Sequence, residues 1–183
     1  ADKTAVVLGC GMEGLLTVAA LKTLGINKII VIDKESEKSR AMEFGAWEFI
    51  GSHGKNGVAG VKDKIRAAAG DMADAVFICT DSPMGRNVAR RFMKNSGSIC
   101  EMGFLCGWRR TPTARYFEDS MPAGGRFYAA RDYENCMNFL AKAAEMKLPL
   151  YKLITHRYKL EEINEAMWTV VREEGLGIAV FNR

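Results

Sequence analysis

The sequence has no apolar run of the roughly 18 residues that a helix needs to cross a bilayer. It also does not open with a charged segment followed by an apolar stretch and a small-residue cleavage site, the pattern of a secretory signal. These two absences predict a cytoplasmic protein with no membrane partner.

Charge of one sign is not concentrated anywhere along the chain. The 26 lysines and arginines are interleaved with 22 aspartates and glutamates, which gives a net charge of +4. Nucleic-acid-binding proteins usually carry a concentrated basic face or arm. The densest basic group here is only Arg109, Arg110 and Arg115, so we predict no nucleic-acid partner.

Metal-ligating side chains are few and scattered. The five cysteines are Cys10, Cys79, Cys100, Cys106 and Cys136. None of them forms a pair with the close spacing of a structural zinc site, and the two histidines, His53 and His156, lie far apart in the chain. We therefore predict reduced thiols, no metal site and no catalytic residues, with His156 as an ordinary surface histidine.

The sequence does contain a regular alternation of strand and helix patterns, without an internal repeat or a low-complexity linker. Runs rich in Val and Ile predict strands at 4–9, 28–33, 47–50, 75–80, 98–102 and 125–130. Helical spacing of apolar residues predicts helices at 13–24, 35–44, 62–69, 84–94 and 133–146. This alternation is typical of an α/β, Rossmann-type doubly wound parallel sheet, here of six strands.

Several local details accompany this fold prediction. Residues 51–60 contain four glycines and are expected to form a loop. In the helix at 133–146 the residues expected to face inward are Cys136, Met137, Leu140 and Ala144. The sequence after residue 149 predicts an extended segment at 150–155, a helix at 160–174 and a strand at 178–181. We expect two parts, residues 1–149 and 150–183.

The pattern Gly9-Cys10-Gly11-Met12-Glu13-Gly14 is the main functional motif. It follows a predicted strand, opens a predicted helix, and precedes Asp33, an acidic residue that ends the next strand. Gly9 allows a tight turn, Gly11 lets the backbone approach a pyrophosphate, and Gly14 lets the helix pack close to the sheet. Asp33 would bind the adenosine ribose and repel the extra phosphate of NADP, so the motif favours NAD. The alternative is a glycine-rich turn that binds another nucleotide or none.

The chain also resembles the coenzyme domain of medium-chain, zinc-type alcohol and polyol dehydrogenases. The resemblance rests on the glycine motif, Asp33, Lys38 and the pair Gly45-Ala46, and it extends to the segments 153–157, 160–166 and 175–177. By this resemblance Lys38 contacts the adenosine ribose. The other residues that would line the cofactor are Met12 and Glu13 in the glycine motif and, by the resemblance flanking the nicotinamide, Thr80, Met102, Gly103 and Phe104.

Two positions depart from the family pattern. Glu13 stands where relatives carry Val or Ile, and Ala179 stands where relatives often carry Arg or Lys. Both changes remove apolar or positive support from the cofactor, so we expect weak affinity for NAD. Cys10, at the start of a helix, is either a reactive thiol or, more simply, a small filler beside the cofactor.

The resemblance implies a catalytic domain, with zinc ligands and a proton relay, that this sequence does not contain. We therefore expect the chain by itself to be incompetent for alcohol oxidation. The alternative is a dinucleotide-sensing or regulatory module without chemistry. Apolar stripes after residue 150 indicate an interface, so the predicted partners are a dinucleotide and either a second copy of the chain, in a homodimer, or the missing catalytic domain.

Overall fold

The computed structural model describes residues 3–52, 57–80, 85, 88–102, 130–172 and 176–181. It divides into two compact units, Ala1–Leu148 and Pro149–Arg183. Each unit is described by itself below. In the described part of the chain, no helix has both the length and the hydropathy needed to cross a membrane.

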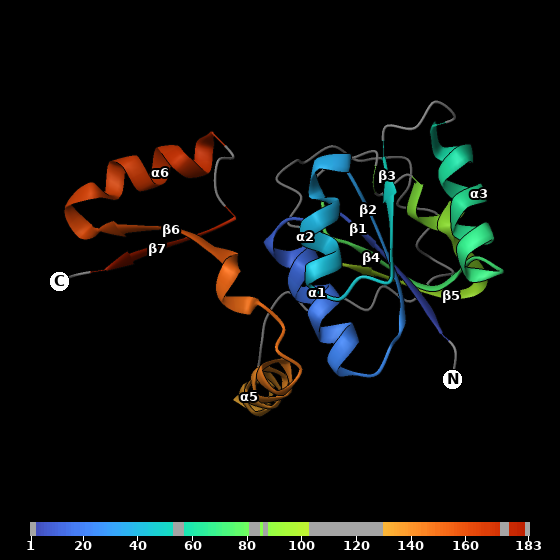
Figure 1. Ribbon diagram of the computed structural model, residues 1–183, viewed down its shortest axis with the longest axis horizontal. Helices are drawn as coiled ribbons and strands as arrows, with labels where there is room; N and C mark the ends of the chain where they lie inside the picture. The colour runs from blue at the N-terminus through green and yellow to red at the C-terminus, as the bar shows by residue number, and fades with distance from the viewer. Residues whose placement is uncertain are drawn as a thin grey trace. The chain divides into compact units, whose positions relative to one another are not determined.

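The first unit is built on a five-stranded parallel sheet (Figure 1). Its strands are β1 (Thr4–Leu8), β2 (Lys28–Asp33), β3 (Glu48–Gly51), β4 (Ala73–Ile78) and β5 (Met93–Glu101), in the order β3-β2-β1-β4-β5. All four pairings are parallel. The predicted doubly wound α/β fold is therefore confirmed. Of the sixth strand predicted at 125–130, Ala130 instead begins a helix, and 125–129 lie outside the described residues.

Helices cover both faces of this sheet. They are α1 (Met12–Thr23), the 3-10 turn η1 (Glu35–Glu37), α2 (Lys38–Glu43), α3 (Gly57–Ala69) and the 3-10 turn η2 (Arg90–Phe92). Val61 and Ile65 of α3 and Phe92 of η2 pack with Val6 of β1 on one face. Helix α1 packs against β1, β2 and β4. Because side chains alternate along a strand, Val7 points to the opposite face from Val6.

Burial on both faces explains the uninterrupted apolar character of the central strands. Ile29, Ile30 and Val31 in β2 are fully buried, as are Val6 and Val7 in β1. Each such side chain stabilises the fold by about 1.5–3 kcal/mol relative to an exposed position. The same burial explains why β2 lies at the predicted residues, since a continuous Ile and Val run is typical of a strand covered on both sides.

Several boundary predictions are wrong. Helix α3 begins at Gly57 rather than 62, so 57–60 are helical and not loop. Strand β5 begins at Met93 rather than 98, because Met93 pairs with Ala73 ahead of a register shift, and the pairing resumes at Ser98. The helix predicted at 84–94 therefore does not include Met93 and Lys94. The chain at 150–153 is the 3-10 turn η4 (Leu150–Leu153) and not extended.

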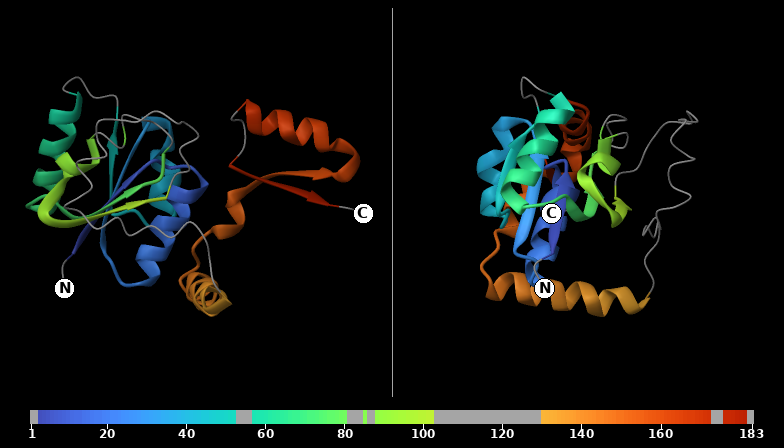
Figure 2. Two further views of the ribbon diagram at one scale, coloured as in Figure 1. Left: turned by 180° about the vertical axis from the view of Figure 1, so that it is seen from behind. Right: turned by 90° about the vertical axis from the view of Figure 1, so that its right-hand side faces the viewer.

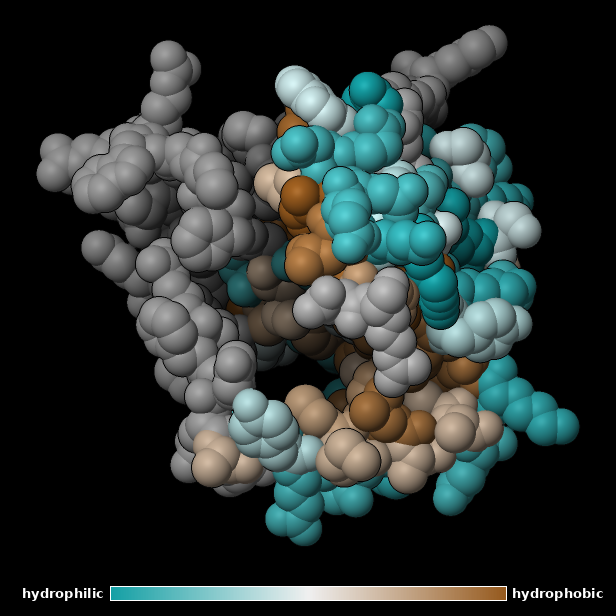
Figure 3. All heavy atoms as spheres, turned by 90° about the vertical axis from the view of Figure 1, so that its left-hand side faces the viewer, coloured by the Kyte–Doolittle hydropathy of each residue, from teal (hydrophilic) through white to brown (hydrophobic). Residues whose placement is uncertain are grey.

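Helix α5 (Ala130–Glu145) completes the first unit. It contacts α1, and Figure 2 shows it running past the lower end of that helix. The four residues predicted to face inward, Cys136, Met137, Leu140 and Ala144, are all exposed, and the buried residue is Ala143. In Figure 3 apolar side chains gather along α5 at the lower edge of the view. The helical period was predicted correctly, but the covering of its apolar stripe was not.

The second unit is a small βαβ arrangement. After η4, strand β6 (Ile154–Lys159) leads through η5 (Leu160–Glu162) and α6 (Ile163–Val171) to β7 (Gly177–Phe181), which pairs with β6 in parallel. The Tyr158 hydroxyl and the Thr169 hydroxyl lie 2.7 Å apart and tie β6 to α6. Apolar side chains on α6 remain exposed in the chain by itself, namely Ile163, Met167, Trp168, Val170 and Val171.

Candidate dinucleotide site

The turn between β1 and α1 requires glycine at two positions for structural reasons. Gly9 has a φ of +102°, which L side chains rarely adopt, and an added Cβ would collide with the carbonyl oxygen of Cys79. An added Cβ on Gly14 would collide with the carbonyl oxygen of Gly9. These two glycines let helix α1 start directly above the end of β1, next to the end of β4.

Gly11 differs from its two neighbours. It is the N-cap of α1 with an extended backbone (φ −70°, ψ −171°) that any residue adopts, and an added Cβ would meet nothing within 4 Å. The fold therefore does not need glycine here. The open space lies where the first turn of α1 presents amides, because the first intrahelical bond is that from Leu15 N–H to the Gly11 carbonyl. Such amides and the helix dipole favour an anionic group.

Asp33 stands beside this turn, at the end of β2. Its Oδ2 accepts a hydrogen bond from the Cys10 backbone N–H at 2.6 Å, and its Oδ1 accepts one from the Lys34 N–H at 2.6 Å. The side chain is partly exposed. A carboxylate offers about four lone pairs, so Asp33 is fixed in place by two backbone groups and can still accept bonds from a ligand.

Cys10 fills the space between the glycine turn and the segment after β2. It is 2% exposed, and its Sγ lies 4.0 Å from the Glu37 carbonyl oxygen. Burial raises the pKa of the Cys10 thiol to about 12, with further contributions from Asp33 and Glu37. The interpretation of Cys10 as a helix-activated thiolate is therefore wrong, and its role is that of a buried filler.

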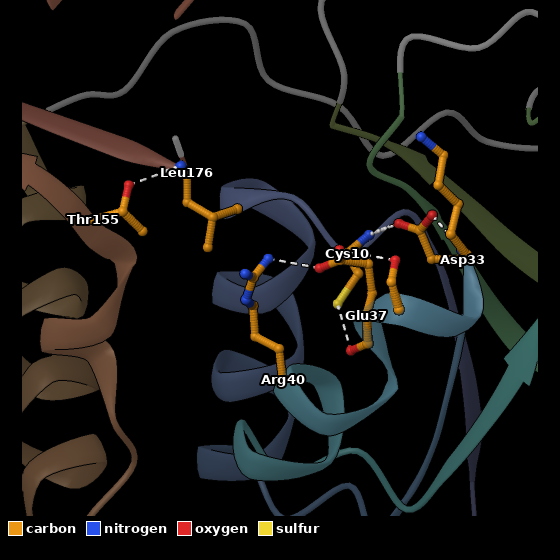
Figure 4. A network of polar contacts seen from close by, with 8 residues as sticks. Cys10, Asp33, Glu37, Arg40, Thr155 and Leu176 are labelled. Atoms are coloured by element: carbon orange, nitrogen blue, oxygen red, sulfur yellow. Dashed lines mark hydrogen bonds and ion pairs between the residues drawn. The ribbon is translucent and has the colours of Figure 1, made fainter. Parts of the chain in front are cut away.

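Two ion pairs lie within the segment that follows Asp33, and Figure 4 shows the one between Glu37 and Arg40. Glu37 Oε2 and Arg40 Nη1 are 2.6 Å apart, and Glu35 Oε1 and Lys38 Nζ are 3.8 Å apart. Lys38, expected to contact the adenosine ribose, thus pairs with Glu35 here. The Glu37–Arg40 pair was not predicted, although its i,i+3 spacing on the predicted helix at 35–44 is the signal that could have found it.

The remaining predicted residues lie at the ends of strands or in the glycine turn. Thr80 follows β4, and its Cβ would lie 3.2 Å from a Cβ on Gly9. Met102 follows β5 and donates its N–H to the Ile78 carbonyl at 2.9 Å. Met12 and Glu13 are exposed in the first turn of α1. Gly103 and Phe104 lie outside the described residues. Since carboxyl ends of parallel strands share one edge, the described members lie along one edge of the sheet.

No metal centre accompanies this edge within the described ranges, where no three His, Cys, Asp or Glu side chains come together. A zinc donor set therefore does not fit the residues described. His156 lies in β6, with its Nδ1 3.0 Å from the Thr155 hydroxyl and its ring stacked on Tyr158. These contacts agree with a partnered surface histidine.

Known proteins share this architecture over about half of their length. A family model described as zinc-binding dehydrogenase matches residues 14–142. Sorbitol dehydrogenase 1 from Saccharomyces cerevisiae is 29% identical over 166 residues, covering 88% of this chain and 46% of that protein. Sorbitol dehydrogenase from Arabidopsis thaliana is 24% identical over 185 residues, covering 99% and 50%. The chain therefore spans about half the length of these curated relatives.

Solved structures show the same fold. An alcohol dehydrogenase from Thermotoga maritima superposes with a TM-score of 0.87 at 21% identity, covering 100% of this chain and 51% of that one. An alcohol dehydrogenase from E. coli CFT073, solved in complex with cofactor NADH, gives a TM-score of 0.73 at 19% identity, covering 98% and 51%.

Proposed function

This chain belongs to the zinc-binding dehydrogenase family, and on that premise we propose that residues 1–148 bind NAD(H) as the coenzyme-binding part of an alcohol or polyol dehydrogenase. The sorbitol dehydrogenases among its relatives support the polyol class. The neighbour that binds NADH supports the choice of a nicotinamide dinucleotide.

The observation that carries this proposal is the open space at Gly11 beside a fixed carboxylate. A diphosphate would lie against the amides of Gly11, Met12 and Glu13, in the space that a Cβ on Gly11 would enter. Asp33 would accept hydrogen bonds from the adjoining ribose hydroxyls with the lone pairs that its two backbone bonds leave free. A phosphate on that ribose would face the Asp33 charge, which favours NAD over NADP.

The bound nicotinamide would supply a hydride acceptor or donor. The residues of this chain bind and orient the dinucleotide. The described residues do not offer a zinc donor set, so no metal-dependent step is assigned to them. We further propose that the exposed apolar side chains of α6 pack on another part of the enzyme or on a second copy of the chain. Light scattering of the chain by itself tests the second-copy alternative.

Calorimetric titration tests the binding proposal. We expect the chain to bind NADH and to bind NADPH at least tenfold more weakly, because the Asp33 carboxylate would repel the extra phosphate of NADPH. Replacing the carboxylate, in Asp33→Ser, should weaken NADH binding and narrow this ratio. The variant Glu48→Gln is the matched control. Glu48 lies at the amino end of β3, whereas Asp33 lies at the carboxyl end of β2. In the contacts described, the Glu48 carboxylate accepts a hydrogen bond only from the adjacent Phe49 N–H. Equal affinity of the wild-type chain for the two dinucleotides would refute the role of Asp33.

A further inference from the structure

A series of contacts links Asp33, the proposed ribose-binding carboxylate, to the guanidinium group of Arg40. The Cys10 N–H donates to Asp33, the Cys10 Sγ lies 4.0 Å from the Glu37 carbonyl oxygen, and the Glu37 carboxylate pairs with Arg40 at 2.6 Å. Figure 4 shows these four residues gathered around the glycine turn and the start of α2. Arg40 is thus linked to Asp33 through Glu37 and Cys10, and it follows Asp33 by seven residues in the chain.

The charges of Asp33, Glu37 and Arg40 all act on the Cys10 thiol. Besides burial, the Asp33 and Glu37 carboxylates raise the pKa of the Cys10 thiol, while the Arg40 guanidinium lowers it. All three charged groups are therefore within electrostatic reach of a single sulfur atom. Arg40 is half-exposed and Glu37 is less so, so the guanidinium is accessible to a ligand from solvent.

Arginine is the side chain best suited to bind a phosphate, because its planar fork donates two parallel hydrogen bonds. A free Arg40 would therefore favour a dinucleotide that carries a phosphate on its adenosine ribose. In this structure one nitrogen of the fork, Nη1, is already engaged by the Glu37 carboxylate. A phosphate that used this nitrogen for a two-bond contact would have to displace Glu37 and leave the Glu37 charge unpaired close to the phosphate charge.

We propose that Glu37 is a specificity-determining residue, which reinforces the selection of NAD over NADP by holding Arg40 away from the ribose phosphate. This inference rests on the proposed function, since it presupposes that Asp33 binds the ribose. It adds a second element to the Asp33 charge: Asp33 repels the phosphate, and Glu37 occupies the arginine that would otherwise attract it.

The test is the ratio of the dissociation constants for NADPH and NADH, measured by calorimetry on the full chain. The substitutions are made in an Asp33→Ser background, where NADPH binding is strong enough to measure. There Glu37→Gln should tighten NADPH binding roughly three- to tenfold, the usual effect of one charge-assisted contact on a partly exposed site, with NADH affinity changed less than twofold. Adding Arg40→Ala to Glu37→Gln should remove most of this gain.

Two controls keep the interpretation specific. Glu48→Gln also removes one negative charge, but at the amino end of β3, away from the proposed dinucleotide site. It should leave the ratio of the NADPH and NADH dissociation constants unchanged. Thermal unfolding should show that Glu37→Gln folds normally, because partly exposed ion pairs contribute little to stability.

The outcomes separate this inference from the proposed function. If the wild-type chain binds neither dinucleotide, the proposed function fails. If it binds NADH but Glu37→Gln leaves the ratio unchanged, the inference is overturned and the function stands. An equal gain in NADPH affinity with and without Arg40 would also overturn it, because the effect would then come from the Glu37 charge alone.

Discussion

Replacing Gly11 by alanine should abolish most of the dinucleotide affinity of this chain while leaving its stability nearly intact. The backbone of Gly11 is extended and an added Cβ meets nothing within 4 Å, so the methyl group strains nothing in the folded chain. Losing a glycine lowers the entropy of the unfolded chain, which stabilises by about 0.4–1 kcal/mol. Alanine is a poorer N-cap, which costs a similar amount, about 0.5–1 kcal/mol. The two effects nearly cancel, and the free energy of unfolding should change by less than about 1 kcal/mol.

The effect on binding should be much larger. The methyl group would occupy the space that the diphosphate needs and would hold it away from the first amides of α1. Losing one hydrogen bond to a charged group costs about 1.5–3 kcal/mol. Since about 1.4 kcal/mol is a tenfold change in affinity, Gly11→Ala should weaken NADH binding roughly 10- to 100-fold.

The assay pairs a calorimetric NADH titration with urea unfolding for three glycine variants. In Gly14→Ala the new Cβ would collide with the Gly9 carbonyl oxygen, so this variant should lose about 1–3 kcal/mol of stability or more. Gly25 lies beyond the other end of α1 at a φ of +84° with open space around it, so Gly25→Ala should lose about 1–2 kcal/mol of stability and keep its affinity for NADH. The reasoning is refuted if Gly11→Ala binds NADH like the wild type, or if it is destabilised as much as Gly14→Ala.

Three further results are expected. The pKa of the Cys10 thiol is raised to about 12, mostly by burial. An alkylating reagent near neutral pH should therefore label the exposed Cys136 and leave Cys10 unmodified until the chain unfolds. Comparable labelling of the two cysteines, measured by peptide mass spectrometry, would contradict this. The pKa of Asp74 is lowered by hydrogen bonds from the Thr4 N–H and from Lys94. The ionised Asp74 therefore stabilises the fold above its unfolded-state pKa of roughly 4, and this stabilisation is lost as the pH falls through the folded-state pKa. In Asp74→Asn the unfolding midpoint should depend less on pH between pH 5 and pH 2, and an unchanged pH dependence would refute this assignment. Glu13 places a carboxylate in the first turn of α1 near the proposed diphosphate, so Glu13→Val should tighten NADH binding severalfold, whereas low-micromolar binding by the wild-type chain would show that Glu13 does not weaken the site.

The central sheet and the glycine turn could be predicted because their determinants are local in sequence. The run from Lys28 to Asp33 is continuous in Ile and Val and ends on an acidic residue, and the structure gives strand β2 those same bounds. Within the six-residue turn, the positive φ of Gly9 and the approach of Gly14 to the Gly9 carbonyl oxygen likewise favour glycine, and the collision of a Gly9 Cβ with Cys79 adds to this from a distant strand.

The features that were missed depend on distant partners. Met93 joins β5 because it pairs with Ala73, twenty residues earlier, and its own sequence context reads equally well as the end of a helix. The stripe on α5 that includes Met137 and Leu140 has the period of a buried helix face, yet burial depends on which element covers it. The contact of Cys10 with the segment after β2 also depends on tertiary packing, which reverses the expected effect of a helix N-terminus on the thiol.

The most direct test of the proposed coenzyme site is a map of backbone amide chemical shifts as NADH is added to the isotopically labelled chain. The proposal predicts that the largest changes fall on the amides from Gly11 to Gly14 and on Asp33 with its neighbour Lys34, with much smaller changes on α3, at the opposite face of the sheet. Saturating NADH that leaves the amides of the glycine turn unshifted, or that shifts a different surface instead, would contradict it.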